Sequence, residues 1–181
     1  MPITFTVGSP RLPQKVKLVA GMISRDTALF DRVRKGMERL FRNKADFESG
    51  VFDFTQTGYY NNEMGDGLKR KFLSFAGTVA LKDLYKVKLL TNALERKFSR
   101  GGNRTVNIDP GYVDLAKLVL FSTKDYSHRL YLGGGIYAEV TLSYKDKTFQ
   151  PWPWTYPDYA TAGYIGTFNA IREIYKKQVC R

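Results

Sequence analysis

The 181-residue chain contains one cysteine, Cys180, and one histidine, His128. A single cysteine excludes an internal disulfide framework and a cysteine-rich zinc site. A single imidazole excludes any catalytic or metal site that needs two histidines. We therefore expect a fold held together by a hydrophobic core, which a chain of this length is able to bury.

Long hydrophobic runs are also absent from the chain. No stretch of about 18 apolar residues occurs, so no helix is expected to span a membrane. The first ten residues, MPITFTVGSP, lack the basic segment and apolar run that mark a secretory signal. These absences predict a cytoplasmic protein with no membrane partner.

The phosphate-binding loop of common nucleotide-binding folds is missing. Its pattern, G-x-x-x-x-G-K-[ST], requires a Gly-Lys dipeptide, and the chain has none. Asn43-Lys44-Ala45-Asp46 matches the N-K-x-D pattern with which GTPases recognise guanine, but no Asp-x-x-Gly accompanies it. We interpret this match as chance at a helix end. Gly133-Gly134-Gly135 lies between two predicted strands, so we interpret it as a hairpin turn.

Positive charge is what the chain has in excess. It holds 29 Lys and Arg against 17 Asp and Glu, a net charge of +12, and 43% of its residues are hydrophobic. This composition predicts a folded chain with one domain, residues 1–181. The excess charge lies in residues 1–44 (+7) and 69–104 (+8), whereas residues 105–159 carry −1. The basic segments either attract a polyanion or form solvated helix faces.

Hydrophobic periodicity predicts the secondary structure. Segments with a 3.6-residue period are predicted helices, and short apolar or alternating segments are predicted strands. The predicted helices are residues 26–43, 83–98 and 161–179, and the predicted strands are residues 15–24, 47–54, 69–75, 104–108, 117–124, 128–132 and 136–144. Residues 69–75 also suit the start of a helix. Asp109-Pro110-Gly111 is predicted to form a turn after the fourth strand.

The order of these elements predicts an α+β fold. Strand–helix–strand–strand–helix–strand is the ferredoxin-like arrangement, an antiparallel sheet with two helices on one face. A β-hairpin and a C-terminal helix are added to it. The apolar face of the second helix is predicted to consist of Leu84, Val87, Leu90, Leu94 and Phe98. In the hairpin, alternation predicts one apolar side, Ile136, Ala138, Val140 and Leu142, and one polar side, Tyr137, Glu139, Thr141 and Ser143.

A candidate site lies on the polar side of this hairpin, where cations and acids are expected on adjoining strands. The proline-rich arm, residues 151–159, is expected to cover it. The aromatic side chains of the arm either stack on a base or a sugar or pack on the chain's own domain. The candidate ligand-binding residues are Arg104, Asp109, Lys124, Arg129, Tyr131, Thr141, Trp154, Tyr156 and Asp158, and the candidate catalytic residues are His128 and Glu139. An ordinary solvated sheet face would carry a similar pattern.

Several strings of the sequence resemble one bacterial family, the domain of unknown function 4416 family. They are VKLVAGMIS at 16–24, KRKFLSF at 69–75, VNIDPGY at 106–112, STKDYSHRLYLGGGIYAEVTLSY at 122–144 and PWTYPDY at 153–159. The resemblance covers nearly the whole chain. Members are often labelled GTP-binding protein, so the resemblance implies a nucleotide ligand, GTP with Mg²⁺.

Three hypotheses about function follow. In the first, the site binds a phosphorylated small molecule, such as a guanine nucleotide: Lys124, Arg129 and Arg104 hold phosphate, and Glu139 and Asp109 hold ribose or an accompanying metal. No dedicated metal site is predicted. In the second, the basic helices bind RNA or another nucleic acid. In the third, the protein is an enzyme in which His128 and Glu139 transfer protons.

Overall fold

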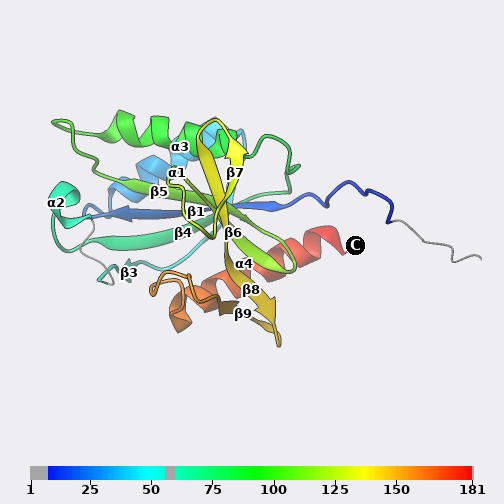
Figure 1. Ribbon diagram of the computed structural model, residues 1–181. Coiled ribbons are helices and arrows are strands. Elements are labelled where there is room, and N and C mark those ends of the chain that lie inside the picture. Colours follow the sequence, from blue (N-terminus) through cyan, green and yellow to red (C-terminus); the bar gives the residue numbers. More distant parts are fainter. Residues whose placement is uncertain (1–7, 56–59, 181) are drawn as a thin grey trace, which may run out of the picture.

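A nine-stranded sheet forms the centre of the computed structural model, which describes residues 8–55 and 60–180 (Figure 1). The strands are β1 Lys17–Ser24, β2 Ala45–Glu48, β3 Phe52–Asp53, β4 Lys69–Phe75, β5 Asn107–Val113, β6 Lys117–Ser122, β7 Leu130–Gly133, β8 Ile136–Lys145 and β9 Thr148–Pro151. Their order is β2-β4-β1-β5-β6-β8-β7, with β3 beside β4 and β9 beside β8. Each of these pairs is antiparallel.

Helices cover both faces of the sheet. Figure 1 shows α1, Leu29–Phe41, and α3, Tyr85–Phe98, on one face, and α4, Ala162–Val179, on the other. A short helix, α2, Asn61–Met64, lies at one end of the sheet. Within the described ranges, no helix is long and apolar enough to cross a membrane.

The buried residues of β1 show how the two hydrophobic cores form. Side chains alternate between the faces of a strand, and Ala20 and Met22 accordingly pack in the cluster of α1 and α3. Val19 points to the opposite face, where it joins Phe168 and Ile171 of α4 in a second cluster. Both faces of β1 are buried, because the strand lies at the centre of the sheet.

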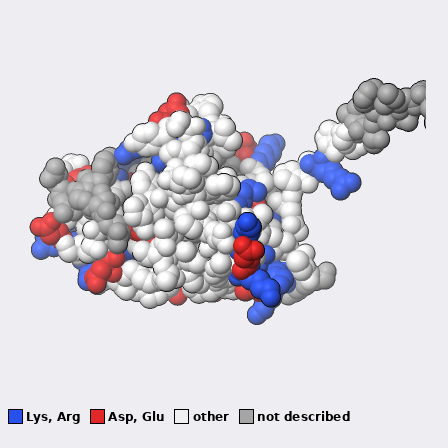
Figure 2. All heavy atoms as spheres, turned by 60° about the horizontal axis from the view of Figure 1, so that its bottom comes forward, with Lys and Arg blue, Asp and Glu red and all other residues white. Residues whose placement is uncertain are grey.

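Charge is sparse over the middle of the α4 face and returns near the C-terminal end of α4, where Lys176 and Lys177 are exposed. Figure 2 views the molecule with this face turned forward and shows few Lys, Arg, Asp or Glu side chains over its middle. From residue 148 to residue 171 the sequence has one charged residue, Asp158, and that side chain is buried. Exposed arginines of α1, such as Arg32 and Arg39, lie on the other side of the sheet.

The α+β class, the helices on one face and the C-terminal helix are confirmed, whereas the ferredoxin-like assignment remains a prediction. Residues 69–75 form a strand, not the start of a helix. The stretch expected as a loop after β3 contains α2, and its residues 57–59 lie outside the described residues.

The predicted turn at Asp109-Pro110-Gly111 is wrong, because these residues lie inside β5. Asp109 pairs with Gly21, and Pro110 pairs with Ala20 of β1. A proline is excluded from a strand that bonds to neighbours on both sides. The strand contains Pro110 because its far side has no partner strand at this position.

The predicted apolar face of the second helix is also partly wrong. Leu90 is exposed. The side chains that α3 buries include the polar residues Lys88, Thr91 and Glu95. Amphipathic periodicity assigns an apolar face to the core, but part of the buried face of α3 lies on backbone groups of β5 and bonds to them.

The strict alternation predicted for the hairpin fails at Leu142. Leu118 of β6 pairs with Leu142, and the next residue of β6, Val119, pairs with Val140. Thr141 is therefore an extra residue in β8, a β-bulge that reverses the alternation beyond it. As a result Leu142 packs with the α4 cluster, whereas Ile136 packs with α1 and α3.

Candidate functional site

The candidate site is a cleft where β5 and β6 separate. The two strands pair at three positions, from Gly111 with Leu120 to Val113 with Leu118. Beyond Gly111, β6 continues along β8, and a cleft of about 530 Å³ opens between β5, β6, α3 and the 151–159 arm. Polar side chains in its walls are Arg70, Lys88, Asn92, Glu95, Arg96, Arg104, Asn107, Asp109, Ser122, Lys124, Arg129, Glu139 and Asp158.

Side chains of α3 replace the missing strand along the open edge of β5. The amino group of Lys88 donates to the carbonyl oxygen of Ile108 at 2.7 Å, and the carboxylate of Glu95 accepts from the Ile108 N–H at 2.7 Å. Pro110, two residues further, points its backbone nitrogen to the same side, and proline has no N–H. Along the edge of β5 that borders the cleft, the N–H and carbonyl groups of Ile108 are therefore hydrogen-bonded, and Pro110 has no N–H to satisfy.

Gly111 allows the two strands to approach each other where they meet. A Cβ atom at this position would lie 2.1 Å from the backbone oxygen of Val119, so no other residue fits. In Asp109-Pro110-Gly111, the glycine permits the close contact between β5 and β6. The proline lies where the two strands separate, because it needs no partner for a backbone N–H. The aspartate places a carboxylate in the cleft.

Arg70 of β4 is the most buried cation of the cleft. Its guanidinium donates to Asp109 at 2.9 Å and to Asp158 of the arm at 3.1 Å. It also lies over the rings of Phe54, Phe72 and Tyr159, 5.1 to 5.4 Å from their centres. These contacts tie the arm to the sheet. Arg70 Nε is buried without a hydrogen-bond partner among the described residues.

Gly21 of β1 leaves the space that Arg70 occupies. A Cβ atom on Gly21 would lie 2.7 Å from Arg70 Nη1 and 3.0 Å from Phe72 Cε1. A glycine inside a buried strand marks a close approach of another group. The approaching group here is the guanidinium.

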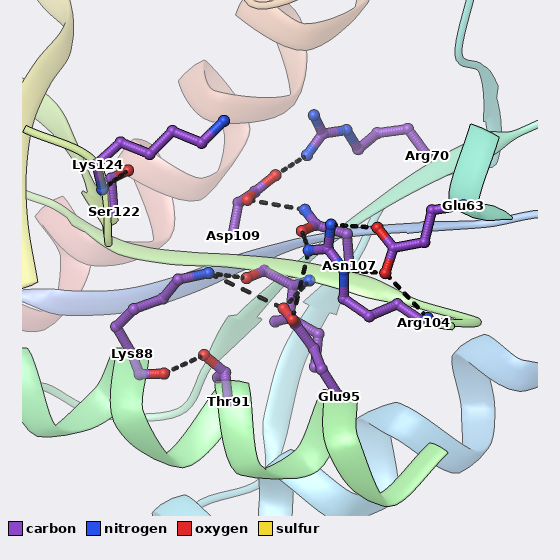
Figure 3. Close-up of polar contacts among 11 residues, drawn as sticks. Glu63, Arg70, Lys88, Thr91, Glu95, Arg104, Asn107, Asp109, Ser122 and Lys124 are labelled. Atoms are coloured by element: carbon purple, nitrogen blue, oxygen red, sulfur yellow. Dashed lines mark hydrogen bonds and ion pairs between the residues drawn. The ribbon is translucent and has the colours of Figure 1, made fainter. Parts of the chain in front are cut away.

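A chain of polar contacts runs along the floor of the cleft (Figure 3). Arg104 binds both carboxylate oxygens of Glu63, through Nε at 2.9 Å and Nη2 at 2.6 Å. Its Nη1 donates to Asn107 at 2.9 Å, and Asn107 donates to Asp109 at 2.9 Å. Since Asp109 also binds Arg70, the chain joins α2 to β4.

The environment moves the pKa values of the cleft carboxyls in different directions. Burial raises the pKa of Asp158, and Arg70 offsets only part of that effect. Burial likewise raises the pKa of Glu95 despite the opposing charge of Lys88. Burial also acts on Asp109, but the charges of Arg70 and Lys88, with a hydrogen bond from Asn107, outweigh it and lower the pKa.

Arg129 joins β8, the loop after β6 and the arm. Its Nε donates to Glu139 at 2.7 Å, and its Nη1 donates to the Ser122 hydroxyl at 2.9 Å and to the Lys124 carbonyl oxygen at 3.0 Å. Its Nη2 donates to the Tyr156 hydroxyl of the arm at 3.2 Å. Arg129 thus forms another connection between the arm and the sheet.

Seven of the predicted site residues line the cleft: Arg104, Asp109, Lys124, Arg129, Glu139, Tyr156 and Asp158. Tyr156 and Asp158 belong to the arm, so the arm forms part of the cleft wall; that it covers a ligand site stays a prediction. The roles assigned to these residues remain predictions. Arg104, expected to hold phosphate, binds Glu63 with two of its nitrogens.

Four predicted residues lie outside the cleft lining. Tyr131 is exposed on β7 and packs on Tyr137. Thr141 is buried and donates to Glu139 at 3.2 Å. Trp154 stacks on Trp152 and donates from its indole nitrogen to a backbone oxygen of β8.

His128 is the fourth of these residues, and it contacts its predicted partner. Its Nε2 lies 3.2 Å from Glu139 Oε2, and its ring stacks between Tyr126 and Trp154. Glu139 uses the same oxygen to bind Arg129.

Several polar residues of the cleft are not among the predicted site residues: Arg70, Lys88, Asn92, Glu95, Arg96 and Asn107. Two signals were available. Gly21 within a buried strand indicates a close approach, and Lys88, Asn92 and Arg96 recur every four residues on one helix face. No cluster of three or more potential metal ligands occurs in residues 8–55 and 60–180.

A family model described as "Domain of unknown function (DUF4416)" matches residues 14–175. No curated protein and no solved structure matches the chain. The assignment of a function therefore depends on the geometry of the cleft.

Proposed function

Since the chain belongs to the DUF4416 family, whose description names no activity, we propose from its cleft that it binds a small phosphorylated molecule, with a guanine nucleotide as the first ligand to test. The observation that carries the proposal is the charge balance of the cleft walls. Six Lys and Arg side chains and four Asp and Glu side chains line the cleft. Figure 3 shows several of them converging from β4, β5 and α3.

Each acid in the cleft already contacts a cation there. Asp109 and Asp158 bind Arg70. Glu139 binds Arg129 at 2.7 Å, and Glu95 lies 3.9 Å from Lys88. Arg96, by contrast, has no acidic partner within the described part of the chain. The walls therefore attract an anionic ligand.

The hydrogen-bond donors that suit phosphate lie in one row on α3. Lys88, Asn92 and Arg96 are four residues apart, so their side chains follow one face of the helix, and all three line the cleft. Lys88 uses one N–H for Ile108, and an ammonium group has three. Arginine offers a planar fork that matches phosphate oxygens. The row thus presents donors to an acceptor-rich ligand.

Aromatic side chains supply the apolar part of the cleft. Phe54, Tyr126 and Tyr156 line it, and flat rings of this kind pack against a nucleobase. The volume of about 530 Å³ lies within the range of small-molecule sites. The choice of guanine rests on the resemblance described above, so adenine nucleotides are the necessary comparison.

Tryptophan fluorescence is a direct test, because both tryptophans of the chain, Trp152 and Trp154, belong to the arm. We expect a saturable change of emission with GTP, GDP or GMP, and a matching rise of the melting temperature. Arg96→Ala should weaken binding about tenfold, which is about 1.4 kcal/mol. Lys97→Ala, at an exposed neighbouring position outside the lining, is the control and should bind as the wild type does.

The proposal fails if neither fluorescence nor melting temperature responds to millimolar GTP, GDP, GMP, ATP or inorganic phosphate. It also fails if Arg96→Ala and Lys97→Ala weaken binding equally, since the effect would then come from net charge.

A further inference from the structure

A second, smaller groove adjoins the cleft. It has a volume of about 380 Å³, and Arg25, Arg100 and Arg104 are its cationic side chains. Arg104 lines both the groove and the cleft. We infer that the ligand of the cleft carries an oligophosphate chain, a diphosphate or longer, that extends past Arg104 into this groove. The inference rests on the proposed function and specifies the ligand class of the same site.

The acids of the second groove are already engaged. Glu63 binds Arg104 through both oxygens. Asp26 accepts the backbone N–H of Ala28 at 3.0 Å, where α1 begins. Arg25 and Arg100 are exposed, and neither has an acidic partner in residues 8–55 and 60–180. Two cations of the groove thus remain to attract an anion.

The positions of the cations along the chain connect the groove with the donor row of α3. Lys88, Asn92 and Arg96 recur every four residues, and Arg100 follows Arg96 at the same interval, two residues beyond the end of the helix. Lys88 and Arg96 alone are separated by about 12 Å along the helix axis. One phosphate group cannot contact the whole row, whereas a chain of linked phosphates follows it.

The shared chemistry is an oligophosphate, and it has two sources: a free nucleoside triphosphate and the 5′-triphosphate end of an RNA. Arg25 and Arg100 would bind the phosphate chain of either ligand in the same way. The experiment therefore includes both kinds of ligand.

The test measures how affinity depends on the number of phosphates. The dissociation constants of GMP, GDP and GTP are compared for wild type and for the double variant Arg25→Ala/Arg100→Ala at one salt concentration. We expect the variant to lose about tenfold in affinity for GTP and none for GMP. Arg39→Ala/Arg42→Ala removes two exposed charges at the C-terminal end of α1, outside the groove. This control should leave the ratio of GTP to GMP affinity unchanged.

The second pair of ligands is a 5′-triphosphorylated RNA pentamer and the same pentamer with a 5′-monophosphate. Preference for the triphosphate end, lost in the Arg25→Ala/Arg100→Ala variant, supports the inference for RNA, and preference for GTP over GMP supports it for free nucleotides. If the variant changes neither ratio, or lowers GMP and GTP affinity equally, the inference is overturned while the proposed function stands. If the wild type binds no phosphorylated ligand, both are overturned.

Discussion

The amino group of Lys88 lies 2.7 Å from the carbonyl oxygen of Ile108, on the side of β5 that β6 leaves open. The neighbouring N–H of Ile108 goes to Glu95. Two side chains of α3 therefore make the bonds that a strand would otherwise make. The cleft exists because these bonds satisfy the backbone where the sheet divides.

Lys88→Met tests whether side chains of α3 replace the hydrogen bonds of a neighbouring strand. Methionine fills similar space but leaves the buried Ile108 carbonyl without its donor and removes one of the two cations within 4 Å of Glu95, of which Arg104 remains. We expect the free energy of unfolding to fall by about 2 to 3 kcal/mol, measured by urea denaturation. Lys86→Met on the same helix removes an exposed ammonium group and should leave the midpoint unchanged. Equal midpoints for the two variants would contradict the assigned role of Lys88.

Gly21→Ala tests the close approach of Arg70 to β1. The added methyl group would displace the guanidinium from Asp109 and Asp158, and overpacking of this kind costs about 1 to 3 kcal/mol. Gly166→Ala, at a helical position with nothing within 4 Å of the added atom, should instead stabilise the protein by about 0.5 to 1 kcal/mol. Thermal unfolding of the two variants should therefore shift in opposite directions.

Asp109→Asn and Asp158→Asn should differ in their pH dependence. The folded-state pKa of Asp109 lies below its ordinary value of 3.8, so its ionised form stabilises the protein above that pH. This stabilisation is lost as the pH falls through the folded pKa. Unfolding free energies from pH 7 to pH 3 should show the deficit of Asp109→Asn shrinking as the pH falls.

The pH dependence of the stabilisation is reversed for Asp158, because its folded-state pKa lies above 3.8. The wild-type carboxyl then loses stabilisation as the pH rises from 3.8 through the folded pKa. Asparagine does not titrate, so the deficit of Asp158→Asn should shrink as the pH rises. Parallel profiles for the two variants would show that Arg70 does not distinguish these carboxyls.

Arg129→Lys should loosen the arm. Lysine keeps the charge but cannot bind Glu139, Ser122 and Tyr156 together, and the loss is expected to be about 2 kcal/mol. Because Trp152 and Trp154 both lie in the arm, their fluorescence emission should shift to the red. Their indole rings should also become more accessible to the quencher iodide. Arg172→Lys changes an arginine that bonds outside the arm, to the Leu115 carbonyl oxygen. Its tryptophan emission should match the wild type.

The sequence predicted the elements better than their contacts. Periodicity identified β1, α1, α3 and α4, because each has a pattern set by burial against the sheet. It failed at Pro110 and at Thr141, since the local patterns of a turn and of a regular strand are the same as those of a strand edge and a bulge. These two positions depend on where β6 lies, which is a long-range property of the fold.

Only some of the cleft residues were predicted, because the others depend in the same way on long-range contacts. Asp109 and Glu139 lie on strands β5 and β8, and Arg129 directly precedes β7; all three line the cleft. Lys88 and Glu95 were not among the predicted site residues, because the sequence alone does not show which polar side chains of a helix are buried until their partners are placed. Their partners are the backbone atoms of Ile108, and the identity of that residue carries no trace of the contact.

The three residue pairs between β5 and β6 have a mechanical consequence. The strands β2, β3, β4, β1 and β5 form one leaf of the sheet, and β6, β8, β7 and β9 form the other. Among the described residues, this short junction carries the strand pairing between the two leaves. Helix α4 packs on both leaves, since its cluster includes Val19 of the first and Leu142 of the second. Helix α3 also contacts both leaves, through β5 of the first and β6 and β8 of the second. The two helices therefore hold the leaves together from opposite faces of the sheet, where the strand pairing between them is short.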